Sequence, residues 1–151
     1  MMDECLACEI VSGRLPVPGG ELHQTDSWIV DHSIGPLGVG TLIVKPKRHV
    51  VHVADLSDDE AAELGPLLRD AARVSTALTD PEQVYVSLWS HAGGVPGHIH
   101  FVVQPVTADT IAVWGRGPKM QVAMFDADEY PDPDDIERFA EAARPLFANS
   151  G

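Results

Sequence analysis

The sequence predicts an α+β fold, in which several short strands are grouped around one long helix. Three observations support this prediction. Apolar, β-branched stretches alternate with Gly- and Pro-containing turns, one segment has an apolar period of 3.6 residues, and a second helical segment ends the chain. We expect about five strands, at residues 22–25, 28–31, 41–44, 84–89 and 98–103.

The long helix is expected to begin after Ser57. Glu60 follows three residues later, which is a capping-box signature, and apolar residues recur at helical spacing as far as Leu78. Gly65-Pro66 lies inside this segment and removes a backbone hydrogen bond, so we expect it to kink the helix or to split it in two. A short helix is also expected within residues 4–12, ended by Gly13.

An acidic loop followed by a helix is expected near the C-terminus, over residues 126–148. The stretch from Asp126 to Asp135 is rich in Pro and Asp, which favours a loop. Asp132 and Pro133 suit the N-cap and first position of the closing helix. Five apolar residues of that helix should face inward: Ile136, Phe139, Ala140, Ala143 and Phe147.

Length and charge limit the classes of function. The 151 residues suit one domain, 1–151, and 10 Lys and Arg against 23 Asp and Glu give a net charge of −13. Nucleic acid and anionic membranes are therefore unexpected partners, because both are bound through clustered cations. The first residues are acidic and no apolar run reaches the length of a membrane span, so we expect a cytoplasmic protein with reduced thiols.

Cys5 and Cys8 form a C-x-x-C pair at the start of the chain. This spacing is typical of a redox pair or of half a tetrahedral metal site, and it also occurs in cysteines without either role. The redox interpretation is weaker here, because no strand precedes the pair. Zinc would need two more nitrogen or sulfur ligands, for which His49 and His98 are candidates.

Two of the seven histidines, His98 and His100, lie two positions apart in a predicted strand. Alternate residues of a strand share one face, so Val102 and Gln104 should lie on the same face as these imidazoles. Three basic residues, Lys45, Lys47 and Arg48, come just before His49. This cluster could meet a phosphate or could compensate nearby acidic residues.

Four motifs follow one another in an order that resembles the histidine triad (HIT) family. They are Cys5-x-x-Cys8-x-Ile-x-x-Gly13, the Pro46-Lys-Arg-His49 turn after a strand, the capped helix, and Gly97-His98-Ile-His100. The resemblance covers about residues 5–105. It implies an antiparallel HIT-like sheet, frequent assembly as a homodimer, and reaction at the α-phosphate of a nucleotide or dinucleotide.

The resemblance also implies roles for individual residues. The second histidine of the triad, here His100, would attack phosphorus and form a nucleotidyl-histidine intermediate. In the C-x-x-C branch, and in the related galactose-1-phosphate uridylyltransferases, zinc is held by residues that correspond to Cys5, Cys8, His49 and His98. Four protein ligands leave no open position, so we expect this zinc to be structural.

The chain departs from the family pattern around the triad. Val102 stands where the family has a third histidine or, in transferases, glutamine. Gln104, one step further along the same face, could supply an amide. The turn before the triad lacks the usual polar side chains, so the phosphate could be bound by nearby polar groups: the Ser90 and His91 side chains and the backbone amide of Gly94. Asp31 falls near the family's ribose-binding acid.

We therefore expect a HIT-like nucleotide hydrolase or nucleotidyltransferase that uses His100 and carries zinc. The alternative is a non-catalytic nucleotide-binding or scaffold protein, which Val102 favours. A redox protein using the two cysteines is the third possibility. Diadenosine polyphosphates, nucleoside phosphoramidates and nucleotide sugars all present the same α-phosphate. In a homodimer, Trp114 and the residues after it would lie near the partner.

Overall fold

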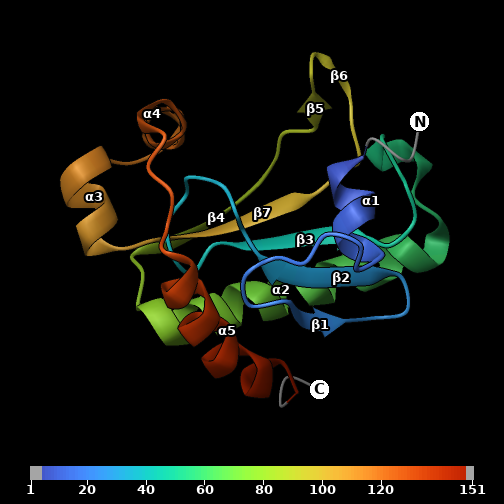
Figure 1. Ribbon diagram of the computed structural model, residues 1–151, viewed down its shortest axis with the longest axis horizontal. Coiled ribbons are helices and arrows are strands. Elements are labelled where there is room, and N and C mark those ends of the chain that lie inside the picture. The colour runs from blue at the N-terminus through green and yellow to red at the C-terminus, as the bar shows by residue number, and fades with distance from the viewer. Residues whose placement is uncertain (1–4, 149–151) are drawn as a thin grey trace.

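Strand pairing builds a five-stranded antiparallel sheet in the computed structural model, which describes residues 5–148 (Figure 1). The strand order across the sheet is β1-β2-β3-β7-β4. The strand bounds are β1 Glu21–Gln24, β2 Trp28–His32, β3 Leu42–Pro46, β4 Gln83–Leu88 and β7 Phe101–Val106. A separate hairpin is formed by β5 (His91–Ala92) and β6 (Val95–Pro96). The predicted α+β class and the number of strands in the main sheet are confirmed.

Helices lie against both faces of the sheet. Their bounds are α1 Leu6–Val11, α2 Asp58–Thr79, α3 Ala108–Trp114, α4 Pro118–Ala127 and α5 Pro133–Ala148, and a 3-10 turn lies at Val53–Asp55. In Figure 1, α2 and α5 lie below the sheet, while α1, α4 and the β5–β6 hairpin rise above it. No helix within residues 5–148 combines the length and apolar character that a membrane span requires.

The main core lies between the sheet and the pair α2 and α5. Ser57 caps α2 with the full capping box, and Asp132 accepts a hydrogen bond from the Asp134 amide at the start of α5. All five apolar residues predicted to face inward on α5 are buried. Phe139, Ala140, Ala143 and Phe147 pack with buried sheet residues, among them Leu22, Trp28, Val30, Leu42, Val44 and Val103.

The structure resolves one alternative and corrects two expectations about element boundaries. Of the two outcomes expected at Gly65-Pro66, a kink or a split, the split does not occur: α2 is one helix, and Leu67 and Ala71 beyond the proline pack in the main core. The last predicted strand begins at Phe101 rather than at His98. Residues 126 and 127, expected in a loop, still belong to α4.

The late start of β7 has a local cause. The residues before it bond to the segment that follows β3, since the Ile99 amide donates to the Val50 carbonyl and the His98 ring donates to the Pro46 carbonyl. His98 and His100 are therefore held by loop contacts, and strand alternation does not fix their directions. From Phe101 onward the alternation holds, because Val103 faces the main core whereas Val102 lies on the opposite face of the sheet.

That opposite face carries a second, smaller cluster. Val102 and Val106 of β7 pack there with Leu37 and with two methionines of α4, Met120 and Met124. Trp114 of α3 packs against the same cluster. Helices α3 and α4 were not predicted, and they give the upper face of the sheet its partial cover.

Candidate metal centre and active-site cavity

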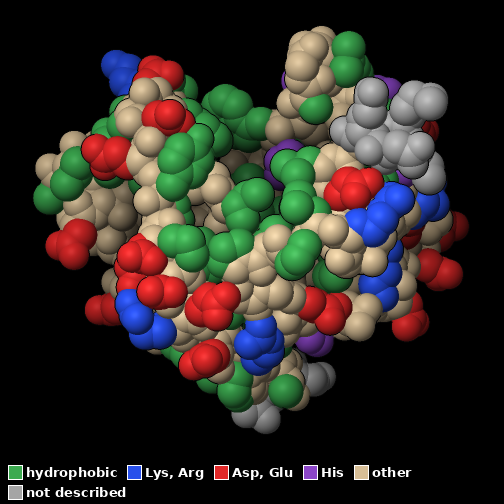
Figure 2. Space-filling view, viewed as in Figure 1, with side chains coloured by type: hydrophobic (Ala, Val, Ile, Leu, Met, Phe, Trp, Pro, Cys, Tyr) green, Lys and Arg blue, Asp and Glu red, His purple; other side chains and the backbone are tan. Residues whose placement is uncertain are grey.

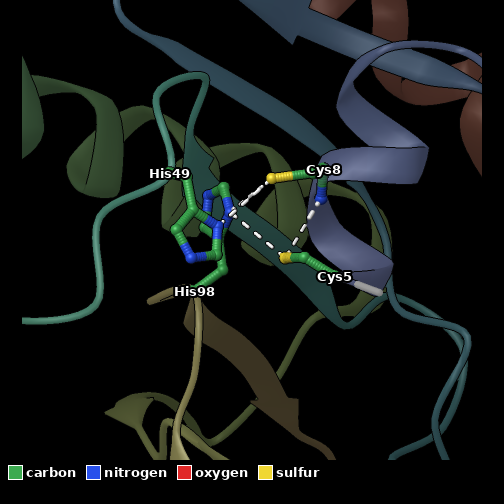
Figure 3. A group of neighbouring side chains, drawn as sticks. All are labelled: Cys5, Cys8, His49 and His98. Carbon is green, nitrogen blue, oxygen red and sulfur yellow. Dashed lines mark hydrogen bonds between the residues drawn. The ribbon is translucent and has the colours of Figure 1, made fainter. Parts of the chain in front are cut away.

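Cys5, Cys8, His49 and His98 converge on one point, although they come from three separate parts of the chain (Figure 3). Cys5 caps α1 and Cys8 lies in its first turn, His49 follows β3, and His98 precedes β7. One donor atom from each residue can be chosen so that all four lie within 4.8 Å of one another. The structure thus brings together the four residues expected to hold zinc.

The distances between donor atoms suit a tetrahedral ion. Cys8 Sγ lies 3.2 Å from His49 Nδ1 and 3.5 Å from His98 Nδ1, and Cys5 Sγ lies 3.6 Å from His98 Nδ1. Zinc–sulfur and zinc–nitrogen bonds of about 2.3 and 2.0–2.1 Å at tetrahedral angles give sulfur–nitrogen separations of about 3.5 Å. Two thiols and two imidazoles at these separations fit Zn²⁺.

The protonation of the cluster also favours a cation. His98 Nε2 donates to the Pro46 carbonyl at 2.8 Å, which leaves Nδ1 without a proton and free to act as a ligand. Burial lowers the pKa of His98 and so favours the neutral ring. In the absence of a metal, burial and the neighbouring Cys5 raise the pKa of Cys8 to about 11. A bound divalent cation would stabilise both thiolates.

An ion pair fixes the turn that carries His49. Arg48 makes two hydrogen bonds to the Glu60 carboxylate, of 2.7 and 3.1 Å. Together with the Ser57 amide, this guanidinium lowers the pKa of Glu60 to about 2. Trp28 Nε1 donates to the Glu60 carbonyl. The start of α2 is thus tied to both β2 and the metal-ligand turn.

A cavity of about 630 Å³ opens beside the metal cluster. Its walls come from α1, β2, β3, the β5–β6 hairpin, the start of β7 and Phe125 of α4. Figure 2 shows its mouth as a hollow between the lobe containing α4 and the hairpin, with histidine atoms visible at its edge. The volume and the largely apolar lining are typical of small-molecule sites.

His100 lines this cavity and is half-buried. Its Nδ1 lies 3.2 Å from the His98 carbonyl oxygen, which can only accept, so Nδ1 carries the proton in this contact. Nε2 then holds the lone pair. His98 and His100 both line the cavity, yet of these two only His98 has a ring nitrogen in contact with the cysteine sulfurs.

Asp31 and Lys45 also line the cavity, and they form a buried ion pair of 2.5 Å. Both side chains are at least 95% buried. Burial raises the pKa of Asp31, and the Lys45 ammonium opposes that rise.

Comparison with known proteins identifies relatives. No protein-family model matches the chain. An adenosine 5'-monophosphoramidase of Schizosaccharomyces pombe is 31% identical over 104 residues, which span 67% of this chain and 73% of that protein. An uncharacterized HIT-like protein of Mycobacterium tuberculosis is 26% identical over 113 residues, which span 72% of this chain and 76% of that protein.

Solved structures agree in fold. A zinc-bound histidine triad family protein from Mycobacterium smegmatis superposes with a TM-score of 0.69 over 99% of this chain and 96% of its own, at 21% identity. A histidine triad nucleotide-binding protein from Sulfolobus tokodaii gives a TM-score of 0.72 over 96% and 93%, at 16% identity. The chain belongs to the histidine triad family.

Placed on this HIT fold, the residues expected to bind phosphate or ribose fall into two groups. Asp31, Ser90 and His91 line the cavity together with His100, whereas Gly94 and Gln104 are not among its lining residues. Gly94 lies in the exposed turn between β5 and β6.

Gln104 lies beneath α4 and is fully buried. Its amide donates to the Leu37 carbonyl at 3.2 Å and contacts Met124 Sδ, while its carbonyl oxygen accepts from Gln121 at 3.0 Å. These bonds connect β7 to the HIT-fold helix that carries Phe125. Gln104 therefore holds α4 against the sheet.

Sequence reasoning missed two features of this HIT cavity. Phe125 belongs to α4, which was not predicted, although Pro118 in its first turn is a helix-start signal. Lys45 was grouped with Lys47 and Arg48 as a basic cluster, but the three differ, because Lys45 is buried whereas Arg48 is exposed. The available signal was that Lys45 lies two residues after Ile43 in a strand, so that both side chains lie on the same face of the sheet.

Proposed function

We propose that this chain is a nucleotide hydrolase or nucleotidyltransferase that acts at an α-phosphate through a nucleotidyl-histidine intermediate on His100. The observation that carries the proposal is the geometry of this ring, with Nδ1–H on the His98 carbonyl and Nε2 free in a cavity of nucleotide size. The similarity to an adenosine 5'-monophosphoramidase supports a nucleoside phosphoramidate as a substrate.

The reaction would proceed in two displacements. His100 Nε2 attacks the α-phosphorus, the bond from phosphorus to the leaving nitrogen or oxygen breaks, and the leaving group takes up a proton from solvent. Water, or a second acceptor in a transferase, then attacks the same phosphorus, loses a proton to solvent and releases the neutral imidazole. The His98 carbonyl would stabilise the positive ring that exists between the two steps, because it accepts the Nδ1 proton.

The lining of the cavity suits the two parts of a nucleotide. Asp31, Lys45 and His100 provide polar groups. Apolar side chains from four elements or loops complete the wall, among them Leu6, Ile34, Val95 and Phe125. We propose that the phosphate lies on the polar side and that the base packs against this apolar wall.

We further propose a structural role for Zn²⁺ at Cys5, Cys8, His49 and His98. Bound there, the ion would supply a crosslink between α1, the turn after β3 and the start of β7, and all four positions of a tetrahedral shell would be protein ligands. His100 would then act as the nucleophile next to a fixed ligand, His98. The homodimer and the cytoplasmic location stay predictions.

A specific observation favours the second candidate, a non-catalytic nucleotide-binding protein. Val102 fills the position of the third triad histidine with an apolar, 8% exposed side chain that belongs to the Met120 and Met124 cluster. It cannot donate a hydrogen bond to a phosphate.

Trapping the intermediate separates the two candidates. The protein is mixed with adenosine 5'-phosphoramidate carrying ³²P at the phosphate, quenched in base, and analysed for labelled protein and for released adenosine monophosphate. We expect base-stable, acid-labile label and release of product in the wild type, and neither in His100→Asn. Tight nucleotide binding without label or turnover would establish the non-catalytic protein instead.

A further inference from the structure

The floor of the cavity contains a buried ion pair that the two displacements at His100 do not use. Lys45 is 1% exposed and Asp31 is 4% exposed, and their side chains meet at 2.5 Å. Removing two charges from water is costly, and such pairs are often no more stabilising than apolar residues of the same size. Fold stability alone is thus a weak reason for this pair.

Lys45 and the proposed nucleophile lie next to the same end of the β3–β7 ladder. The last pair of that ladder is Val44 with Phe101; Lys45 is the next residue of β3, and His100 comes just before the start of β7. Ile43, which lies on the same face of β3 as Lys45, pairs with Val102. Lys45 and His100 both lie beyond the Val44–Phe101 pair at that end of the ladder, and both line the cavity.

Charge makes Lys45 distinctive within the site. Among the described residues that line the cavity, it is the single Lys or Arg, in a chain of net charge −13. A phosphate bound there would need a cation to offset both its own charge and that of Asp31.

The lysine also has donors to spare. Its ammonium carries three N–H groups, and within residues 5–148 its one hydrogen-bond partner is Asp31. Two donors of an almost completely buried cation are therefore free at the cavity floor. Donors of this kind, held in place by a counter-ion, are suited to a non-bridging phosphate oxygen.

We propose that Lys45 binds the α-phosphate of the nucleotide beside His100, in place of the donor that Val102 cannot provide. Asp31 is then the positioning residue that holds the ammonium in place in the free protein. This inference rests on the proposed function, since it assigns a phosphate to the cavity. It also changes the role expected of Asp31, from a ribose ligand to the counter-ion of Lys45.

The test compares two ligands that differ only in the phosphate, adenosine and adenosine monophosphate. The ratio of their dissociation constants measures what the phosphate contributes, and contacts to base and ribose cancel in it. Calorimetric titration of the metal-loaded protein supplies both constants. We expect Lys45→Met to reduce this ratio by about 10- to 100-fold, the range for a hydrogen bond to a charged group, while adenosine affinity changes little.

Two further variants guard against misfolding. Lys45→Met alone leaves Asp31 buried without a partner, so the neutral double variant Asp31→Asn/Lys45→Met removes both charges together. It should show the same loss of phosphate selectivity at a melting temperature near that of the wild type. Lys45→Arg keeps the charge and should keep most of the ratio.

The outcomes for Lys45 and for the proposed reaction are separate. If the folded double variant still prefers adenosine monophosphate as strongly as the wild type does, the assignment of Lys45 is wrong. It is equally wrong if the wild type binds both ligands alike. If the wild type shows the phosphate preference but never turns over a phosphoramidate, the hydrolase proposal fails while Lys45 retains its role.

Discussion

The metal-ligand cluster and the cavity are neighbouring regions with opposite designs. In the cluster, four donors from distant parts of the chain face one another, and the second nitrogen of His98 is also bonded. In the cavity, His100 has one bonded nitrogen, and the Lys45 ammonium has unused donors. Polar atoms that have partners within the protein stabilise the fold, whereas polar atoms without partners at a cavity wall are available to a ligand.

The two regions also differ in charge. The cluster contains no cationic side chain, and the pKa of Cys8 is raised to about 11 without a metal. The two cysteines therefore need a bound cation to be stable as thiolates. The cavity has the Lys45 cation already built in and paired with Asp31. A metal would complete the cluster, and an anion would complete the cavity.

The largest expected effect is the contrast between two variants in which either His98 or His100, at the border of the two regions, is replaced by Asn. His98→Asn removes a metal ligand, so the protein should lose zinc, and its melting temperature should fall by about 10 °C or more. In a protein of this size 1 kcal/mol corresponds to about 2–4 °C, and structural zinc contributes several kcal/mol. His100→Asn should keep both zinc content and melting temperature.

Metal analysis and thermal unfolding of the two purified variants check this contrast. Chelation of zinc from the wild type is the matched control, since it should lower the melting temperature as His98→Asn does. Equal zinc content in both variants, or equal melting temperatures, would break the division between a structural and a ligand-binding region.

The part of the fold that could be predicted is the part whose signals are local. Alternation and helical periodicity located the five strands of the main sheet and α2, and the capping residues Ser57 and Asp132 located the starts of two helices. Helices α3 and α4 have weaker signals, a Thr107 cap and Pro118 in the first turn, which were not recognised. The hydrophobic side of α4 becomes clear only when Met120 and Met124 meet Val102, a contact that local sequence does not reveal.

The same division holds for the site. Cys5, Cys8, His49 and His98 could be predicted as a set because each lies in a motif with fixed spacing, and the structure places them together. Gln104 was expected to be a phosphate ligand because it shares a strand face with Val102. Alternation correctly assigned the face, but α4 covers that part of it, and the amide is used up by Leu37 and Gln121.

A smaller effect is expected from restoring the third histidine. If Lys45 already binds the phosphate, Val102→His should raise the rate of the proposed phosphoramidate hydrolysis less than tenfold over the wild type. In the Asp31→Asn/Lys45→Met background the same change should recover about 10²-fold, the contribution of one transition-state donor. Steady-state rates of the four proteins check this, with Val102→Leu as the control for packing. A 10²-fold rise in rate when Val102→His is introduced into the wild type would show that Lys45 does not donate to the phosphate.

The smallest effect concerns His32, a buried histidine at the edge of the cavity that resembles His98 in having both nitrogens bonded. Its Nδ1 donates to the Ser33 carbonyl at 2.7 Å and its Nε2 accepts from the Gly40 amide at 2.8 Å, so a second proton would face a donor. Burial accordingly lowers the pKa of His32, and the Ser33 contact only partly opposes this.

A lowered pKa in the folded state means that the unfolded chain takes up the proton first as the pH falls below about 6.5. The contribution of His32 is complete above that pH and declines below it, by at most about 1.4 kcal/mol per pH unit for one proton. Urea unfolding of the metal-loaded protein at several values between pH 5 and 8 measures the decline. His32→Gln, whose amide oxygen can still accept from Gly40, should have the shallower pH dependence. Because the two proteins share every other titrating group, parallel curves would mean that His32 binds a proton equally well in the folded and unfolded states, and its likeness to His98 would end there.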